Sequence, residues 1–529
     1  IVGSSTVLQT KQALHGPGPL HLGDTEPLHL YAGSGDIQGI TLFSAKQARI
    51  LAGNDITDIA FYLQNVDEND VSIVAAGRDI VAYNANASLR AKAQAPGNAL
   101  NVNELPLAGD IQISGPGTLE VLAGRNLDLG TGASNSDGTA SGITSIGNAR
   151  NPYLPFEGAG VIAGAGIGFA NGLANGSLDL ETFLDDIVKS EKGAAYLQEL
   201  AATIPTLKAV TTVQALDQLS EEQRAIVAVQ MFYLVLRDAG RSQGDAITGG
   251  GYDEGYAAIE ALFPNASGKG DINTQARDIR TRSGGNITLF SPVGSLTLAT
   301  ATIGAPLAPP GVVTEAGGNI SVFTQNNVDI GISRIFTLRG GNIMIWSSEG
   351  DIAAGSSAKT VQSAPPTRVI IDPQTADVKT DLAGLATGGG IGVLDTIAGV
   401  TPGNVDLIAP SGTVDAGDAG VRSAGNLNIA AAQVLNASNI QVAGSSSGTP
   451  ASAPPSAPSL ASVVAPTTAT QQTTNPAEEE KKRERESRQE ETPPSLISVE
   501  VIGYGGGSQE EDEEERRRKK AEAVEVSGA

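Results

Sequence analysis

The sequence predicts a mainly β protein whose strands wind as a parallel β-helix, a solenoid in which each coil stacks on the last. Three observations lead to this fold class. A triplet of glycine, a small polar residue and an aliphatic residue recurs along most of the 529 residues. Short runs that alternate between apolar and other residues follow these triplets, as strands with one buried face require. Glycine occupies 65 positions and aromatic residues only 4% of the chain, so aliphatic side chains and alanine must fill the core.

The triplet is predicted to mark corners of the chain. Glycine allows a left-handed backbone or a close approach of two segments. Asn or Asp tolerates the left-handed conformation and can bond the backbone two residues on. The units begin at Gly35, Gly53, Gly77, Gly109, Gly124, Gly270, Gly285, Gly318, Gly341, Gly350, Gly403 and Gly425. Each one is therefore expected to turn the chain into its next strand.

The repetition of one turn chemistry separates two all-β architectures. A sandwich or barrel folds its strands back antiparallel and uses different turns at its two ends. In a coil the same corner returns at the same azimuth, so the same residues suit it each time. Stacked Asn side chains can also form hydrogen-bonded ladders. The units are irregularly spaced, so the coils are expected to carry loops, which solenoids place on one face.

The chain is predicted to have four parts. Residues 1–170 form the first part of the β-helix, 171–267 an α-helical insertion, and 268–445 the second part of the β-helix. Residues 446–529 are rich in Ser, Ala, Pro and Thr and then in charge runs, which predicts a disordered linker and a solvated tail. Within the tail, residues 496–503 are predicted to form a short strand that could add to an exposed sheet edge.

The insertion is predicted to hold three helices. Apolar residues at helical spacing between residues 178 and 201 indicate the first. The capping box Ser220-Glu221-Glu222-Gln223 opens the second, and Gly240 is expected to end it as a C-cap. The third covers residues 255–263, just before a proline. The stripe Met231-Phe232-Tyr233 is predicted to pack rather than to hold a ligand.

Composition argues against several functions. The chain carries 34 basic and 58 acidic residues, a net charge of −24, so no nucleic-acid partner is expected. It has no cysteine, and therefore no disulfide framework, thiolate nucleophile or cysteine-bound metal. No run of 18 apolar residues occurs, so no transmembrane helix is expected. From its first residues, IVGSSTV, we expect the chain to be the later part of a longer precursor.

The three histidines, His15, His21 and His29, do not predict a metal site. His21 and His29 each lie in a Pro-Leu-His-Leu repeat. Alternation is expected to place each of these two opposite its flanking leucines, facing solvent. Their spacing fits no zinc pattern, and a Ser-His-Asp or Cys-His centre has little else to draw on.

Two acidic groups are candidates for the carboxylate pairs of polysaccharide-cleaving enzymes. One is Asp415 with Asp418, and the other is Asp67, Glu68 and Asp70. Both groups fit glycine-rich or polar turns, so we expect them to be corner residues. Neither a calcium-binding nonapeptide repeat nor an EF-hand loop occurs. The sequence therefore predicts no catalytic residue, no cofactor and no metal, and the chain is not expected to be an enzyme.

Several runs of residues resemble filamentous haemagglutinin-like exoproteins. The runs GDIQGITLFSAKQARILAGNDITD and DVSIVAAGRDI are similar to the repeats of that family. Others look like the C-terminal region of its large outer-membrane members: GYDEGYAAIEALFP, GDINTQARDIRTRSGGNITLFSPVGSL, GGNIMIWSSEGDIAAGSSAKT and GNVDLIAPSGTVDAGDAGVRSAGNLNIAA. The similarity covers roughly residues 25–445.

The resemblance implies a right-handed β-helix exported by two-partner secretion through a dedicated outer-membrane pore protein. It also implies an adhesin, at the bacterial cell surface, in the outer membrane or secreted, that attaches to an unknown host or cell-surface receptor. It offers no catalytic residues. Two alternatives stay open: a β-helical enzyme that degrades polysaccharides, and an exoprotein that captures a host haem or metal carrier.

Overall fold

The structure is a computed structural model, in which residues 1–453 form the first of two units. It describes residues 18–95, 107–131, 142–167, 178–188, 190–204, 207–242, 252–275, 277–299, 310–356, 361–362, 368–371, 378–381, 386–394 and 399–450. Of the predicted disordered part, residues 446–529, only 446–450 are described, and they begin with the short strand β33 (Ser446–Ser447), so the solenoid extends past the predicted boundary at 445. The predicted strand at 496–503 and His15 lie outside the described residues.

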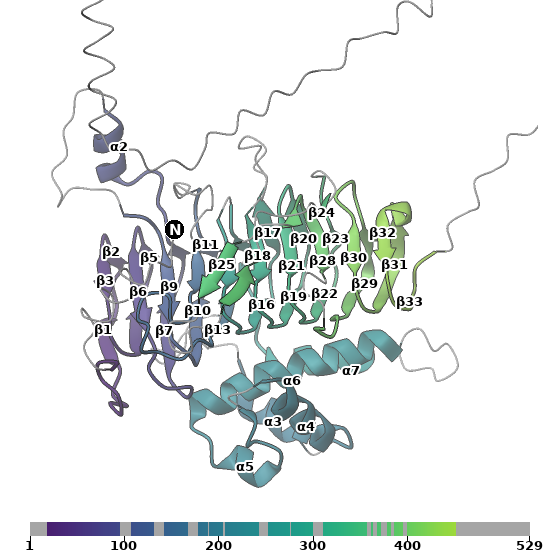
Figure 1. The fold of residues 1–529 in the computed structure, drawn as a ribbon, viewed down its shortest axis with the longest axis horizontal. Coiled ribbons are helices and arrows are strands. Elements are labelled where there is room, and N and C mark those ends of the chain that lie inside the picture. The colour runs from purple at the N-terminus through teal and green to yellow at the C-terminus, as the bar shows by residue number, and fades with distance from the viewer. Residues whose placement is uncertain are drawn as a thin grey trace, which may run out of the picture. The chain divides into compact units, whose positions relative to one another are not determined.

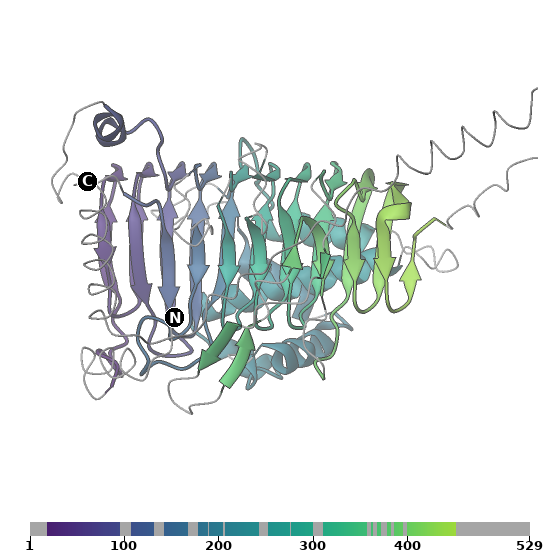
Figure 2. The ribbon, with the colours of Figure 1, turned by 45° about the horizontal axis from the view of Figure 1, so that its top comes forward.

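The first unit is a stack of coils (Figures 1 and 2). Most coils have three strands. β1 (Leu28–Ala32) pairs with β4 (Ala48–Ala52), β2 (Ile37–Gln38) with β5 (Ile56–Thr57), and β3 (Thr41–Phe43) with β6 (Ala60–Gln64), all in parallel. Along the stack, each strand pairs in the same way with the strand on the same face of the next coil. Parallel pairing of this kind confirms the parallel β-helix over the described strands. The right-handed winding stays a prediction.

The three faces of the stack are named here by chain order. The first face holds β1, β4, β7 (Val71–Ala76), β10 (Thr118–Ala123), β13 (Gly160–Ala165), β16 (Ile287–Ser291), β19 (Ile320–Thr324), β22 (Ile343–Ser347), β29 (Val405–Asp415), β31 (Leu427–Leu435) and β33 (Ser446–Ser447). The second holds β2, β5, β8 (Ile80–Val81), β11 (Leu127–Asp128), β14 (Ile272–Asn273), β17 (Leu296–Ala299), β20 (Val328–Gly331) and β23 (Ile352–Ala353). β29 and β31 continue around the corner into the second face, because β23 pairs with the end of β29.

The third face is a 10-stranded sheet, so it counts ten coils. Its strands are β3, β6, β9 (Ile111–Ser114), β12 (Ile143–Ser145), β15 (Ile279–Thr281), β18 (Gly311–Thr314), β21 (Arg334–Thr337), β28 (Gly390–Val393), β30 (Val421–Ser423) and β32 (Ile440–Val442). Short elements leave the coils as excursions: α2 (Ser88–Gln94), β24 (Val361–Gln362), β25 (Arg368–Ile371), β26 (Val378–Asp381), β27 (Ala386–Thr387) and the 3₁₀ turn η4 (Ala437–Asn439). The pairs β24–β27 and β25–β26 are antiparallel.

The core is a column of aliphatic side chains inside the coils. On the first face, Val74 aligns with Val121, and further along Leu289 aligns with Val322 and Ile345, all fully buried. Stacking an aliphatic side chain on its neighbours stabilises the fold by about 1.5–3 kcal/mol. Since each coil buries its side chains on the coils before and after it, every coil contributes to one continuous core.

The recurring triplet occupies more than one corner, which corrects the expectation of a single azimuth. The glycine-asparagine triplets lie between the third and first faces, where each Asn Oδ1 accepts the backbone N–H of the next Asn at 2.8–2.9 Å: Asn286, Asn319, Asn342, Asn404 and Asn426. This ladder of asparagines confirms the predicted one. Glycine-aspartate triplets lie between the first and second faces, and Gly109 precedes β9 on the third face.

The second ladder has the same geometry with carboxylates. Asp36 accepts the N–H of Asp55, and Asp55 accepts that of Asp79, both at 3.1 Å. Arg78 and Arg125 bind the carboxylates of Asp55 and Asp79. A three-sided coil needs several corners, and each corner that starts a strand needs an acceptor beside it. For this reason one sequence pattern occurs at more than one corner of the coil.

The two residues before Asn342 are both glycines because the backbone there is in the left-handed region, with φ of +74° at Gly340 and +92° at Gly341. A Cβ on Gly341 would lie 2.0 Å from the carbonyl oxygen of Gly318. Thr337 Oγ1 donates to the carbonyl of Gly341 at 3.0 Å and closes the turn. The corner therefore excludes any side chain at this point.

The helical insertion leaves the fifth coil after β13 and returns at β14. It holds α3 (Leu180–Val188), α4 (Gly193–Thr203), α5 (Val213–Asp217), α6 (Glu221–Ser242) and α7 (Asp253–Leu262). The first predicted helix is in fact two, α3 and α4, and α5 was not predicted. The capping box is confirmed, since Ser220 and Gln223 exchange two hydrogen bonds of 3.3 Å.

The prediction that Gly240 ends α6 is wrong, because α6 continues to Ser242. A Cβ on Gly240 would lie 2.3 Å from Cδ1 of Ile408 on β29. Glycine is needed here for close packing of a helix on a strand. Figures 1 and 2 show α6 lying along the stack, beside strands of many coils.

Candidate functional site

An apolar interface within the first unit joins the helices to the outer surface of the first face. Phe290, Phe323, Trp346 and Ile408 lie in register on β16, β19, β22 and β29. They point away from the core, because their neighbours Leu289, Val322, Ile345 and Leu407 belong to it. All four are at most 2% exposed. These strands are thus buried on both sides.

Aromatic side chains of the helices cover this row. The ring of Phe232 on α6 meets Phe323 edge to face, with centroids 5.2 Å apart. Phe263 lies 5.9 Å from Phe290, and Tyr256 of α7 lies 5.8 Å from Trp346. Edge-to-face pairs of this kind add about 0.5–1.5 kcal/mol beyond the area that they bury. The aromatic contacts therefore make the helices part of the folded unit.

The stripe Met231-Phe232-Tyr233 is packed, as predicted. The three side chains are at most 3% exposed. The hydroxyl of Tyr233 donates to the carbonyl of Leu289 at 2.6 Å, and burial raises the pKa of Tyr233 well above its usual range. The stripe is therefore bound to the solenoid by a buried hydrogen bond as well as by apolar contact.

A polar row runs beside the aromatic one and fixes the direction of α6. Arg49 on β4 bonds Glu222, Thr288 on β16 accepts from Gln230 at 3.0 Å, and Asp406 on β29 accepts two bonds of 2.8 Å from Arg241. These three strands belong to the second, sixth and ninth coils. A helix of 22 residues is about 33 Å long, and seven coil steps of about 4.8 Å cover a similar distance. The helix therefore runs parallel to the stack.

A carboxylic acid lies in the interface near the start of α6. Glu120 on β10 is half-buried between Ile73 and Ile162 in the register of the first face. The pKa of Glu120 is raised from 4.5 to about 7, mainly by burial and in addition by the charge of Glu222, while Arg49 acts in the opposite direction. The interface thus contains one group that changes charge near neutral pH.

The covered face was not predicted from the sequence, although a signal was present. A strand with one solvated face carries polar residues at alternate positions, and IMIWS and ISVFT place Trp346 and Phe323 at such positions. Large aromatic residues on the supposed outer side of adjacent strands indicate that something covers them. Only the register, which the sequence does not give, shows that they form one row.

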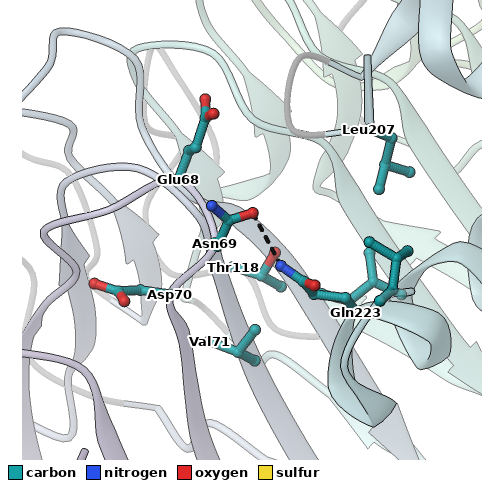
Figure 3. Close-up of a pocket in the computed structure, with 9 residues that line it drawn as sticks. Glu68, Asn69, Asp70, Val71, Thr118, Leu207 and Gln223 are labelled. Atoms are coloured by element: carbon teal, nitrogen blue, oxygen red, sulfur yellow. Dashed lines mark hydrogen bonds between the residues drawn. The ribbon is translucent and has the colours of Figure 1, made fainter. Parts of the chain in front are cut away.

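The acidic group Asp67, Glu68 and Asp70 lies in the turn between β6 and β7, at the edge of the helix interface (Figure 3). The Asp70 carboxylate accepts the N–H groups of Val66 and Asp67 at 2.8 and 3.0 Å. Asp67 accepts two bonds of 2.9 Å from Asn69, whose own side chain accepts from Gln223.

The cavity beside this turn measures about 20 Å³, enough for a water molecule and not for a sugar ring. In Figure 3, Glu68 and Asp70 point in different directions. The turn therefore does not present two carboxyl groups to one substrate. The carboxylates of Asp67 and Asp70 bond the turn itself, in the corner role that the sequence predicts.

The pair Asp415 and Asp418 lies at the corner between the second and third faces, in the ninth coil. The Asp415 carboxylate accepts from Gly417 N–H at 2.8 Å and from Asn436 Nδ2 at 2.6 Å. With Asp329, Ser356 and other residues it lines an open depression of about 470 Å³. This depression has the size of a ligand site and an acidic lining.

The two described histidines behave differently. His29 on β1 is exposed while Leu28 and Leu30 pack on the core, as predicted from their alternation. The prediction is wrong for the first repeat, because Leu20 and Leu22 are 63% and 74% exposed. His21 is left-handed, with φ of +62°, and its Nδ1 lies 3.0 Å from Asp24, so this segment is a turn and not a strand.

No group of three or more His, Cys, Asp or Glu side chains in the described part could hold a metal ion. Among the helices of that part, none is both long enough and apolar enough to cross a membrane.

Comparison with known proteins gives one match. Neither the curated proteins nor the solved structures contain a match to the chain. Residues 340–451, which include β22, β29, β30, β31 and β32, match the model of a family described as filamentous haemagglutinin family outer membrane protein, and within this segment the match confirms the resemblance that its sequence predicts.

Proposed function

We propose that the chain is a structural segment of an adhesin, a shaft that is secreted or held at the bacterial cell surface and attaches to a host or cell-surface receptor. The observation that carries this proposal is the stack of ten coils on one aliphatic core, in a chain with a filamentous haemagglutinin family match. A solenoid presents a long surface and gains stability coil by coil. The proposed role needs no catalytic residue.

Export through a dedicated outer-membrane pore protein, by two-partner secretion, belongs to the same proposal. The absence of cysteine supports it, since no disulfide forms before the chain crosses the pore. Coils that stack in sequence could also draw the chain outward as it emerges. Deletion of the gene for the pore protein should remove the protein from the cell surface. An unchanged amount of surface protein would contradict the export route.

Adhesion is tested with the purified 529-residue chain. The chain should bind host cells or immobilised glycans in a saturable manner, and excess unlabelled chain should compete with this binding. A matched control is the same chain digested by a protease and added at equal mass, because a chain diluted out of urea would refold. The proposal fails if native and digested chains bind equally or if neither binds.

A polysaccharide-degrading enzyme is the second candidate, and the depression near Asp415 and Asp418 favours it. An enzyme of this class would shorten oligosaccharides, and the double variant Asp415→Asn with Asp418→Asn would abolish the shortening. An adhesin would leave the lengths unchanged. Chromatography of a panel of acidic and neutral oligosaccharides separates the two functions.

A further inference from the structure

The helices lie on coils that precede them and on coils that follow them in the sequence, and their aromatic contacts are all with the later ones. The helical insertion ends with α7 at Leu262, and the chain returns to the solenoid at β14. The aromatic row under the helices comes afterwards: Phe290, Phe323, Trp346 and Ile408 belong to the sixth, seventh, eighth and ninth coils. The aromatic part of the surface that receives the helices therefore does not exist until these later coils have stacked.

Contacts with earlier coils are made by aliphatic and polar side chains, without aromatic rings, and include Leu51 and Ile73 of β4 and β7. Glu222 bonds Arg49, and Gln223 donates to Asn69 at 2.9 Å. Ala75, Leu122 and Ile162 supply small or aliphatic contacts from β7, β10 and β13. All of the ring-to-ring contacts between the insertion and the solenoid are made with β16, β19 and β22.

We propose that α6 and α7 form a strap that docks late and locks the stack. The early coils form first, the insertion forms its helices while still undocked, and the later coils then build the surface on which it closes. Closure joins Arg49 in the second coil to Asp406 in the ninth through one helix, so separation of the coils between them requires the strap to open. This inference concerns assembly and is independent of the proposed adhesion.

Two small residues are where the strap comes closest to the solenoid. A Cβ on Gly240 would lie 2.3 Å from Ile408, and one on Gly255 would lie 2.5 Å from the ring of Trp346. A glycine inside a helix costs about 1 kcal/mol relative to alanine. The cost is offset by a helix-to-strand approach that no larger residue permits, which indicates that closure, and not helix formation, sets these positions.

The chain contains its own probe of closure. Trp346 is the one tryptophan of the sequence, and it is fully buried although its side chain points away from the core. Its cover is Tyr252, Gly255 and Tyr256 at the start of α7. Its fluorescence therefore reports docking of the strap, whereas protection of strand amides from hydrogen exchange reports stacking of the coils.

The first experiment refolds the native full chain from urea. Trp346 fluorescence is followed in parallel with pulse-labelled hydrogen exchange of the strands. The proposal expects amides of β16, β19 and β22 to be protected with a larger rate constant than that of Trp346 burial. Coincident rate constants, or burial of Trp346 before strand protection, would overturn it.

The second experiment uses Gly240→Leu at equilibrium, with Ala195→Leu on the exposed side of α4 as the matched control. Leucine favours a helix over glycine, so the first variant should keep its helices and still fail to dock. We expect a red shift of Trp346 emission and faster proteolysis between α6 and α7, with strand protection retained. The control variant should show neither the red shift nor the faster proteolysis. Loss of strand protection together with the red shift would show one inseparable unit and overturn the strap.

A third measurement traps the closed state. The built Cβ of Gly240 lies 2.5 and 3.2 Å from Cγ1 and Cγ2 of Ile408, hence roughly within 4 Å of its Cβ, a separation that a disulfide spans. Gly240→Cys with Ile408→Cys gives the only cysteine pair in the chain. Oxidation at successive refolding times should bridge the pair only after strand protection has risen. Bridging before that protection would overturn the order of assembly.

Discussion

Arg241 at the end of α6 and Asp406 on β29 form a two-bond ion pair across 165 positions of sequence, with both N···O distances at 2.8 Å. The two partners are unequally buried. The Asp406 side chain is 2% exposed, whereas that of Arg241 is 42% exposed. Replacing one partner by alanine should therefore cost a different amount of stability from replacing the other.

Arg241→Ala should destabilise the protein more than Asp406→Ala. The first change leaves a buried carboxylate without its counter-charge, which costs about 3–5 kcal/mol. The second leaves a guanidinium that can turn to water, so the loss is closer to that of a charged hydrogen bond, about 1.5–3 kcal/mol. Urea unfolding of the two variants measures the difference.

The double variant of this pair is the control. It should be less destabilised than Arg241→Ala alone, because removal of Asp406 also removes the buried charge. Equal losses for the two single variants, or a double variant with the sum of both losses, would contradict the asymmetric burial.

The raised pKa of Glu120 predicts that the stability of the protein falls as pH rises. Its pKa is about 7 in the folded protein and near the ordinary 4.5 in the unfolded chain. Between these values the folded state holds a proton that the unfolded state has lost, so the free energy of unfolding decreases with pH, by at most roughly 3 kcal/mol. Above about pH 7 the contribution of this group becomes constant. Thermal unfolding at pH 5, 6, 7 and 8 measures the slope.

Glu120→Gln is the matched variant for this prediction. Its amide has almost the same shape and never ionises, so the part of the slope between pH 4.5 and 7 that comes from Glu120 should disappear, and the variant should be the more stable protein at pH 8. If wild type and variant show parallel pH profiles, Glu120 ionises in the folded state as it does in water.

Gly341→Ala should destabilise the stack strongly. The residue has a φ of +92°, and its new Cβ would lie 2.0 Å from the carbonyl oxygen of Gly318, which belongs to the backbone and cannot turn aside. Strain of the left-handed backbone alone costs about 1–2 kcal/mol, and the clash adds to it. Gly33→Ala is the control, because a Cβ there meets nothing within 4 Å. Urea midpoints should fall for the first variant and stay unchanged for the second.

The parallel β-helix could be predicted because its signals are local. A glycine, an acceptor and an alternating strand lie within a few residues, as in the run from Gly340 to Trp346, and their repetition excludes a sandwich. Assignment of each triplet to a corner could not be predicted, since Gly341 and Gly350 carry the same pattern and differ only in which face of the coil follows.

The role of the helices depends on contacts between distant residues. The capping box at Ser220 was visible because it is local, whereas Gly240 looked like a helix end because its partner, Ile408, lies far along the chain. In the same way Asp415 could be assigned to a corner from its neighbours. The depression that it shares with Asp329 depends on the stacking of separate coils.

Phe323 provides the last prediction. Phe323→Ala should lower the free energy of unfolding by about 3–5 kcal/mol, because the ring is fully buried and contacts Phe232 and Phe263 of the helices. Phe43→Ala is the control of the same residue type on the same solenoid, and its ring is 69% exposed, so its loss should be small. The two variants delete the same atoms and differ in what covers them. If both cost the same, the first face is not covered by α6 in solution, and the polar contacts from Arg49 to Asp406 would not hold the helix there.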